Sequence, residues 1–68
     1  MENTISKIIL NARREKNYTL AQVSTKINIS ISYLSDIERG RKTPSFQVLK
    51  KLINALELPV EKLFHDNI

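Results

Sequence analysis

The sequence of 68 residues predicts an all-α fold with five helices. Apolar residues recur three or four positions apart in five successive segments, which is the period of one helix face. Residues that cap or end helices stand between these segments. No segment alternates apolar and polar residues over the length of a strand with turn residues at its ends. The chain is therefore expected to build its core by packing helices alone.

The first helix is expected to run from about Thr4 to Lys16. Thr4 is a suitable N-cap, and Asn17 is among the few non-glycine residues that tolerate the left-handed conformation that ends a helix. The residues expected to face the core share one stripe, namely Ile5, Ile8, Ile9 and Ala12.

The second helix is expected to begin after Thr19 and to end near Lys26 or Ile27. Gln22 lies three residues after Thr19, and this spacing predicts a capping box in which the two side chains bond each other's backbone amides. Asn28 supplies the turn that follows.

Ser30 is the expected cap of a third helix that continues to Arg39, and Gly40 ends it. The spacing of Val23 and Ile27, and of Leu34 and Ile37, predicts that the second and third helices pack together on one side only. The free side of the third helix is short and mostly polar. This layout is typical of a helix-turn-helix whose second helix enters the major groove of DNA.

The fourth helix is expected from Ser45 to Leu56, after a loop that ends at Pro44. Its predicted core stripe comprises Leu49, Leu52, Ile53 and Leu56, with Phe46 one turn earlier. Pro59 is expected in the first turn of a short fifth helix that carries Val60, Leu63 and Phe64.

The charge of the chain is uneven along its length. There are 11 Lys and Arg against 7 Asp and Glu, a net charge of +4. Residues 1–44 hold eight basic and four acidic residues, whereas residues 45–68 hold three of each, so the whole excess lies with the predicted helix-turn-helix. Such a surface suits a polyanion, because each cation that meets a phosphate releases a counterion. A solvated basic surface is the alternative.

The composition argues against several classes of function. The chain has no Cys, one His (His65) and one Gly (Gly40), so no metal site, catalytic constellation or glycine-rich phosphate loop is expected, and no cofactor. No apolar run approaches the ~20 residues that span a membrane, and the N-terminus does not resemble a signal peptide. A cytoplasmic protein that is not an enzyme is expected.

A specific run, YLSDIERGRKTPS from Tyr33 to Ser45, resembles the lambda-repressor-like (Cro/cI, XRE) helix-turn-helix family. Arg13, Thr19 and Val23 and the later pairs Leu49–Leu52 and Leu63–Phe64 agree with that family in the same register. The resemblance implies a compact five-helix domain. We expect a single domain over residues 1–68, with residues 64–68 as a tail or a dimer contact. The resemblance also implies that the second and third helices form the DNA-binding unit.

The resemblance implies that four side chains of the third helix contact bases, namely Ile31, Ser32, Ser35 and Asp36. The two serines could donate to base acceptors or to phosphate, and Asp36 could accept from a cytosine amino group. Ile31 could contact a thymine methyl group, or it could be partly buried against the second helix.

A second group is implied to contact phosphates, namely Thr19, Tyr33, Arg39, Arg41, Lys42, Thr43 and Ser45. Thr19 and Ser45 stand at helix N-termini, whose free amides and dipoles favour anions. Tyr33 could stack on the sugar–phosphate backbone or cover the junction between helices. Leu20 stands where the family usually has a polar residue, which removes one side-chain contact to phosphate.

Arg13 and Glu38 match an internal ion pair of the family that would hold the third helix against the first. A planar guanidinium can bond a carboxylate twice. The alternative is an Arg13 that faces solvent and phosphate. Asn17, Asn28 and Glu57 replace glycines of the family at turns, and Glu57 is the one for which a left-handed conformation is most costly.

The sequence therefore predicts a sequence-specific regulator of transcription that binds double-stranded DNA. A homodimer on a palindromic operator is expected, because one small domain covers few base pairs. Candidate dimer contacts are Val60, Glu61 and Ile68. The sequence does not distinguish three uses of such a domain, namely phage-type repressors, restriction–modification controllers and antitoxin-like autorepressors. It also does not identify a protein antagonist. The alternative function is a protein-interaction module on the same fold.

Overall fold

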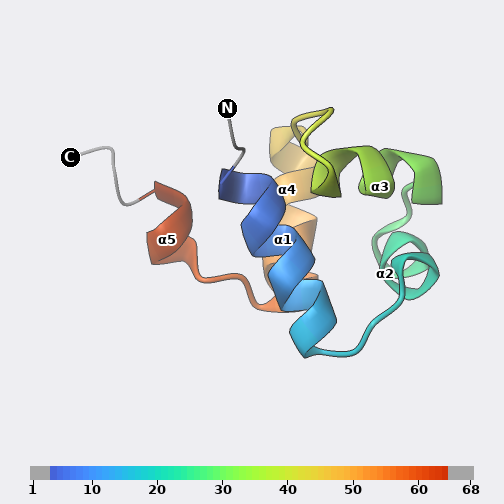
Figure 1. Ribbon diagram of the computed structural model, residues 1–68, viewed down its shortest axis with the longest axis horizontal. Coiled ribbons are helices and arrows are strands. Elements are labelled where there is room, and N and C mark those ends of the chain that lie inside the picture. Colours follow the sequence, from blue (N-terminus) through green and yellow to red (C-terminus); the bar gives the residue numbers. More distant parts are fainter. Residues whose placement is uncertain (1–3, 65–68) are drawn as a thin grey trace.

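Five α-helices, joined by short turns, make up the part of the chain that is described in a computed structural model, residues 4–64 (Figure 1). In chain order they are α1 (Thr4–Glu15), α2 (Leu20–Ile27), α3 (Ile31–Glu38), α4 (Phe46–Leu56) and α5 (Val60–Phe64). Residues 4–64 contain no strand, which confirms the all-α prediction. Ile68 and His65 lie outside the described residues, as does the side chain of Phe64.

Predicted caps begin α2, α3 and α4, whereas Thr4, predicted as the cap of the first helix, is itself the first helical residue of α1. The amide of Gln22 donates to Thr19 Oγ1 at 3.0 Å and the amide of Thr19 donates to Gln22 Oε1 at 2.8 Å, so the capping box is confirmed. Ser30 Oγ accepts from the amide of Tyr33, and Ser45 Oγ accepts from that of Val48. The helix ends differ by one or two residues from the predictions. For example, α1 ends at Glu15 and α5 begins just after Pro59.

Left-handed residues follow four of the helices, α1 to α4. Asn17, Asn28 and Glu57 have φ values of 60°, 61° and 54°, and Gly40 has 78°. An asparagine tolerates this region because its short side chain can bond locally, but a glutamate pays more for it. The Glu57 carboxylate also pairs with Lys16 Nζ at 3.1 Å on the surface, which joins the end of α1 to the end of α4.

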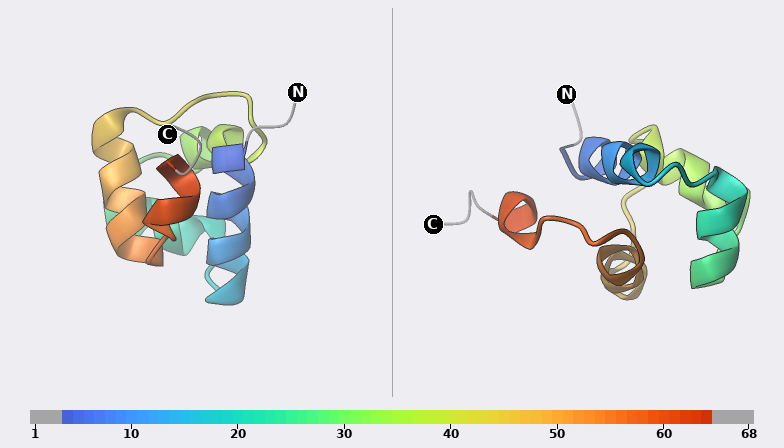
Figure 2. Two further views of the ribbon diagram at one scale, coloured as in Figure 1. Left: turned by 90° about the vertical axis from the view of Figure 1, so that its left-hand side faces the viewer. Right: turned by 90° about the horizontal axis from the view of Figure 1, so that it is seen from below.

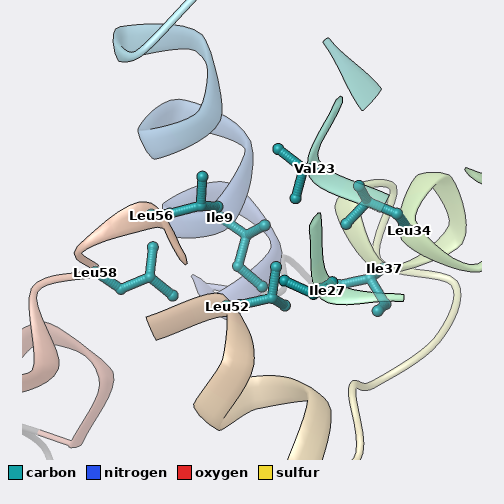
Figure 3. Packing of buried hydrophobic residues seen from close by; sticks show 8 residues of the cluster. All are labelled: Ile9, Val23, Ile27, Leu34, Ile37, Leu52, Leu56 and Leu58. Atoms are coloured by element: carbon teal, nitrogen blue, oxygen red, sulfur yellow. The ribbon is translucent and has the colours of Figure 1, made fainter. Parts of the chain in front are cut away.

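The core lies where α1, α2, α3 and α4 meet (Figure 3). Its side chains are buried aliphatic residues from four helices and the turn after α4, namely Ile9, Val23, Ile27, Leu34, Ile37, Leu52, Leu56 and Leu58. The helix α1 contacts α3, α4 and α5, and α2 contacts α3 and α4. Figures 1 and 2 show α5 at the opposite end of the molecule from α2 and α3.

The structure corrects the prediction that Phe46 belongs to the core stripe of α4. Leu49, Leu52 and Leu56 form the buried face, whereas Phe46 is 70% exposed. Successive residues turn by about 100°, so Phe46 lies roughly a quarter turn from the middle of the face that these leucines form. Its three-residue spacing from Leu49 alone therefore did not predict whether Phe46 is buried.

Residues 4–64 lack two features that would indicate other functions. None of their helices is long and apolar enough to cross a membrane. Within the same residues, no three His, Cys, Asp or Glu side chains gather in a way that could hold a metal ion.

Candidate nucleic-acid interface

The helices α2 and α3 form a rigid pair because their facing side chains are fully buried. Val23 and Leu34 are inaccessible to solvent, as is Ile37, and Ile27 is nearly so. The turn between the helices is closed by backbone bonds from the amides of Asn28 and Ile29 to carbonyls of the last turn of α2. The burial of this side leaves the other side of α3 to face solvent.

The four predicted base-contacting residues occupy the accessible part of α3. Ser32 is exposed and Ser35 is half-buried, and both lie on the side away from Leu34 and Ile37. Ile31, the first residue of the helix, is 50% exposed, so one part of its surface is covered by the domain and the other part is accessible to a partner. Hydroxyl groups from this helix can therefore approach a partner without repacking the core.

Asp36 is joined to the loop that follows α3. Its carbonyl accepts the amides of Arg41 and Lys42, at 2.9 and 3.3 Å, and its carboxylate lies 3.6 Å from Lys42 Nζ. The carboxylate therefore lies on the accessible side of α3 and also pairs with a lysine of the loop. The sequence alone did not indicate this relationship, although an i to i+5 backbone bond is common where a glycine ends a helix.

Tyr33 connects α3 with the start of α4. Its ring packs against the core, and its hydroxyl accepts a hydrogen bond from the amide of Ser45 at 3.3 Å. Lys42 Nζ lies 5.9 Å from the centre of the ring. Tyr33 was predicted either to stack on the sugar–phosphate backbone or to cover the junction between helices, and its ring lies at this junction. Because its hydroxyl oxygen is the acceptor in the bond with Ser45, its proton can be donated to another group.

Arg13 and Glu38 form the ion pair that the resemblance implies. Arg13 Nε donates to Glu38 Oε2 at 2.7 Å and Nη2 donates to Oε1 at 3.0 Å, while Nη1 donates to the carbonyl of Tyr18 at 2.8 Å. The two side chains are only 14% and 6% exposed. The hydrogen bond to Glu38 raises the pKa of Arg13, although burial acts in the opposite direction. Glu38 is thus committed to the scaffold.

The loop from Arg39 to Ser45 carries a group of exposed polar and basic side chains, namely Arg39, Arg41, Lys42, Thr43 and Ser45. Pro44 is buried and anchors this loop on the domain. The loop is held at both ends by α3, through the carbonyl of Asp36 and the hydroxyl of Tyr33. The cations are therefore presented beside the accessible polar side of α3.

The start of α2 offers a smaller polar surface. Thr19 is exposed, but its Oγ1 already accepts the amide of Gln22. Leu20 is half-buried and packs against the core, so the departure from the family's polar residue adds apolar contact to the scaffold. Val60 and Glu61, the described dimer candidates, are exposed on α5 at the other end of the molecule.

Comparison with known proteins gives a consistent result. A family model described as helix-turn-helix matches residues 9–63. The transcriptional regulator ClgR of Mycobacterium tuberculosis is 36% identical over 66 residues, which cover 97% of this chain and 59% of ClgR. The transcriptional regulator SlrR of Bacillus subtilis is 44% identical over 61 residues, or 88% of this chain and 40% of SlrR. This chain thus spans about half the length of these relatives.

A solved structure shows the same arrangement of helices. The biofilm regulator SinR in complex with DNA matches with a TM-score of 0.76 and 40% identity, over 87% of this chain and 98% of that one. Three observations point to the same family: the buried α2–α3 pair, the run from Tyr33 to Ser45, and the family match over most of the chain. The chain therefore belongs to the lambda-repressor-like (XRE) helix-turn-helix family.

Proposed function

We propose that this chain is a sequence-specific regulator of transcription that binds double-stranded DNA. The observation that carries the proposal is the pairing of an accessible polar side of α3 with a basic loop that α3 itself holds in place. Two relatives named as transcriptional regulators, and SinR solved with DNA, support it. The proposed role is not enzymatic, needs no cofactor and is exercised in the cytoplasm.

In the proposed complex, α3 lies in the major groove. Ser32 and Ser35 hydrogen-bond to base edges, and the exposed part of Ile31 contacts a thymine methyl group. Asp36 accepts from a cytosine amino group at the edge of the contact, while Lys42 balances its charge against nearby phosphates. Base contacts of this kind determine which sequence is bound.

The phosphate contacts come from the elements around α3. Arg39, Arg41 and Lys42 meet the backbone through their charge, and Thr43, Ser45 and Thr19 through hydroxyl groups and the free amides of helix N-termini. Tyr33 donates the proton that its bond with Ser45 leaves free. These contacts position the protein on any duplex and supply most of its affinity.

We further propose that the chain acts as one domain over residues 1–68 and binds a palindromic operator as a homodimer. The contact between copies is assigned to α5 and the tail, through Val60, Glu61 and Ile68. In support, Val60 is 45% exposed on an element that lies away from the DNA-facing side. Repressors and controller-type autoregulators both fit this arrangement, whose half-sites would lie about one helical turn apart.

The second candidate is a protein-interaction module on the same fold. It is favoured by two apolar residues, Leu20 and Ile31, on or near the side of the molecule that is proposed to face DNA. The two functions differ in their response to salt, because only binding to a polyanion releases many counterions.

Binding of the full chain to random duplex DNA should be measured across a series of salt concentrations. We expect measurable affinity at low salt and a steep decrease as the salt concentration rises. Selection of bound duplexes from a random pool should then yield a two-fold symmetric site. An absence of binding at low salt, or an affinity that is independent of salt, would leave the protein-interaction module as the better proposal.

A further inference from the structure

The side chain of Phe46 has no role in the core or in the contacts proposed above. It is 70% exposed, more than Ile31 or Val60, which are the other exposed large apolar residues of the described part. Single exposed apolar residues are normal on protein surfaces. Phe46 differs from them because of what surrounds it.

The ring projects from a rigid point beside the proposed DNA contact. Ser45, the preceding residue, caps α4 and is tied by its own amide to Tyr33 on α3. The backbone that carries Phe46 is therefore held at a constant position relative to the groove-facing helix. Phe46 is thus adjacent in sequence to the loop from Arg39 to Ser45, which is proposed to meet phosphates.

The charge around the ring is positive. Lys50, one turn later on α4, places its Nζ 5.1 Å from the centre of the Phe46 ring. Lys42 and Arg41 lie on the adjoining loop, and the first turn of α4 contains no acidic residue. The ring is thus an apolar spot within a basic surface, and such a surface favours an anionic partner over a second copy of itself.

We infer that Phe46 packs against the sugar–phosphate backbone of the duplex whose groove α3 enters, an inference that rests on the proposed function. The ring covers the apolar C–H surface of a deoxyribose, while Lys50 faces the adjoining phosphate. A second copy docked on this face would bring the two sets of lysines together. The contact is apolar and lies on the sugar, so it adds affinity without reading a base.

The test compares Phe46→Ala with wild type on two duplexes, one selected from a random pool and one unrelated, across a series of salt concentrations. We expect about fivefold weaker binding to both duplexes, since burial of a few tens of Å² of apolar surface suffices for that change. The slope of log K against log salt should stay the same, because no charge is removed. Arg41→Ala should lower the slope by about one.

Two further variants complete the design. Phe46→Leu retains an apolar side chain and should recover part of the affinity, whereas Asn54→Ala, an exposed change on the same helix, should have no effect. Thermal unfolding verifies that each variant is folded, as expected for exposed positions.

Each remaining outcome has a definite meaning. Unchanged affinity of Phe46→Ala, with wild type binding normally, overturns this inference alone. If Phe46→Ala binds DNA more weakly and also self-associates more weakly than wild type in sedimentation equilibrium without DNA, that result overturns the inference and assigns the ring to a contact between copies. Wild type that binds neither duplex at low salt overturns the proposed function, and this inference with it.

Discussion

The guanidinium of Arg13 on α1 and the carboxylate of Glu38 at the end of α3 face each other with two hydrogen bonds, of 2.7 and 3.0 Å. A third bond joins the same guanidinium to the carbonyl of Tyr18, just before α2. One side chain therefore connects α1 with both ends of the helix-turn-helix. It also holds a carboxylate away from a surface that needs to attract phosphates.

Replacement of Arg13 by Ala should destabilise the fold by about 2–4 kcal/mol, because Glu38 is left as a nearly buried charge without its partner. Arg13→Lys should recover little, since an ammonium cannot make the two parallel bonds. Urea unfolding at low temperature measures the change. Arg14→Ala, at the exposed neighbouring position, is the matched control. Equal stability of the two alanine variants would contradict the structural role of the pair.

Tyr33→Phe should lower the stability by about 1 kcal/mol, because the amide of Ser45 loses the acceptor that the structure shows. It should also weaken binding to all duplexes several-fold without altering the preferred sequence, since the proposed phosphate donor is lost and the start of α4 is no longer tied to α3. Urea unfolding measures the stability. Fluorescence anisotropy on selected and unrelated duplexes measures the affinity and the sequence preference.

Tyr18→Phe provides the control for this prediction. The hydroxyl of Tyr18 has no hydrogen-bond partner within residues 4–64, although its ring also packs against the core. Its removal should leave stability and DNA binding close to wild type. If the two Phe variants behave alike, the link between Tyr33 and Ser45 contributes nothing.

Glu57→Gly should raise the stability by about 0.5–1 kcal/mol, because a glycine adopts the left-handed conformation at φ 54° without steric cost. The loss of the exposed ion pair with Lys16 offsets part of the gain. For a domain of this size the melting temperature should rise by roughly 2–8 °C. Lys16→Gln isolates the contribution of the ion pair, and a lower melting temperature for Glu57→Gly than for Lys16→Gln would refute the strain argument.

Ser32→Ala should change which sequence the protein selects, because the hydroxyl of Ser32 is exposed on the groove side of α3. Arg41→Ala should instead weaken binding to selected and unrelated duplexes alike. Selection from a random pool with each variant distinguishes the two effects. A Ser32→Ala protein that selects the wild-type site with unchanged stringency would assign base readout to other residues of α3.

Local signals predicted most of the fold. The capping box of Thr19 and Gln22, and the serines that cap α3 and α4, lie within three residues of the amides they bond, so the chain itself brings the partners together. Asn17 and Asn28 end their segments for the same local reason. The exposure of Phe46 was not predicted, because its three-residue spacing from Leu49 is typical of a shared face, whereas it lies about a quarter turn from the middle of the face that the leucines of α4 form together.

By itself, the sequence determined the helices to within one or two residues of their ends, the polar side of α3 and the excess of basic charge near it, because each depends on residues close together in the chain. Only the tertiary structure decided three contacts. The Asp36 carboxylate pairs with Lys42, the Tyr33 hydroxyl accepts from the amide of Ser45, and the Arg13 guanidinium bonds Tyr18 as well as Glu38. These contacts need helix axes and loop ends at specific distances. Such distances follow from how Ile9, Val23, Leu34 and Leu52 fill one shared core, which no local pattern specifies.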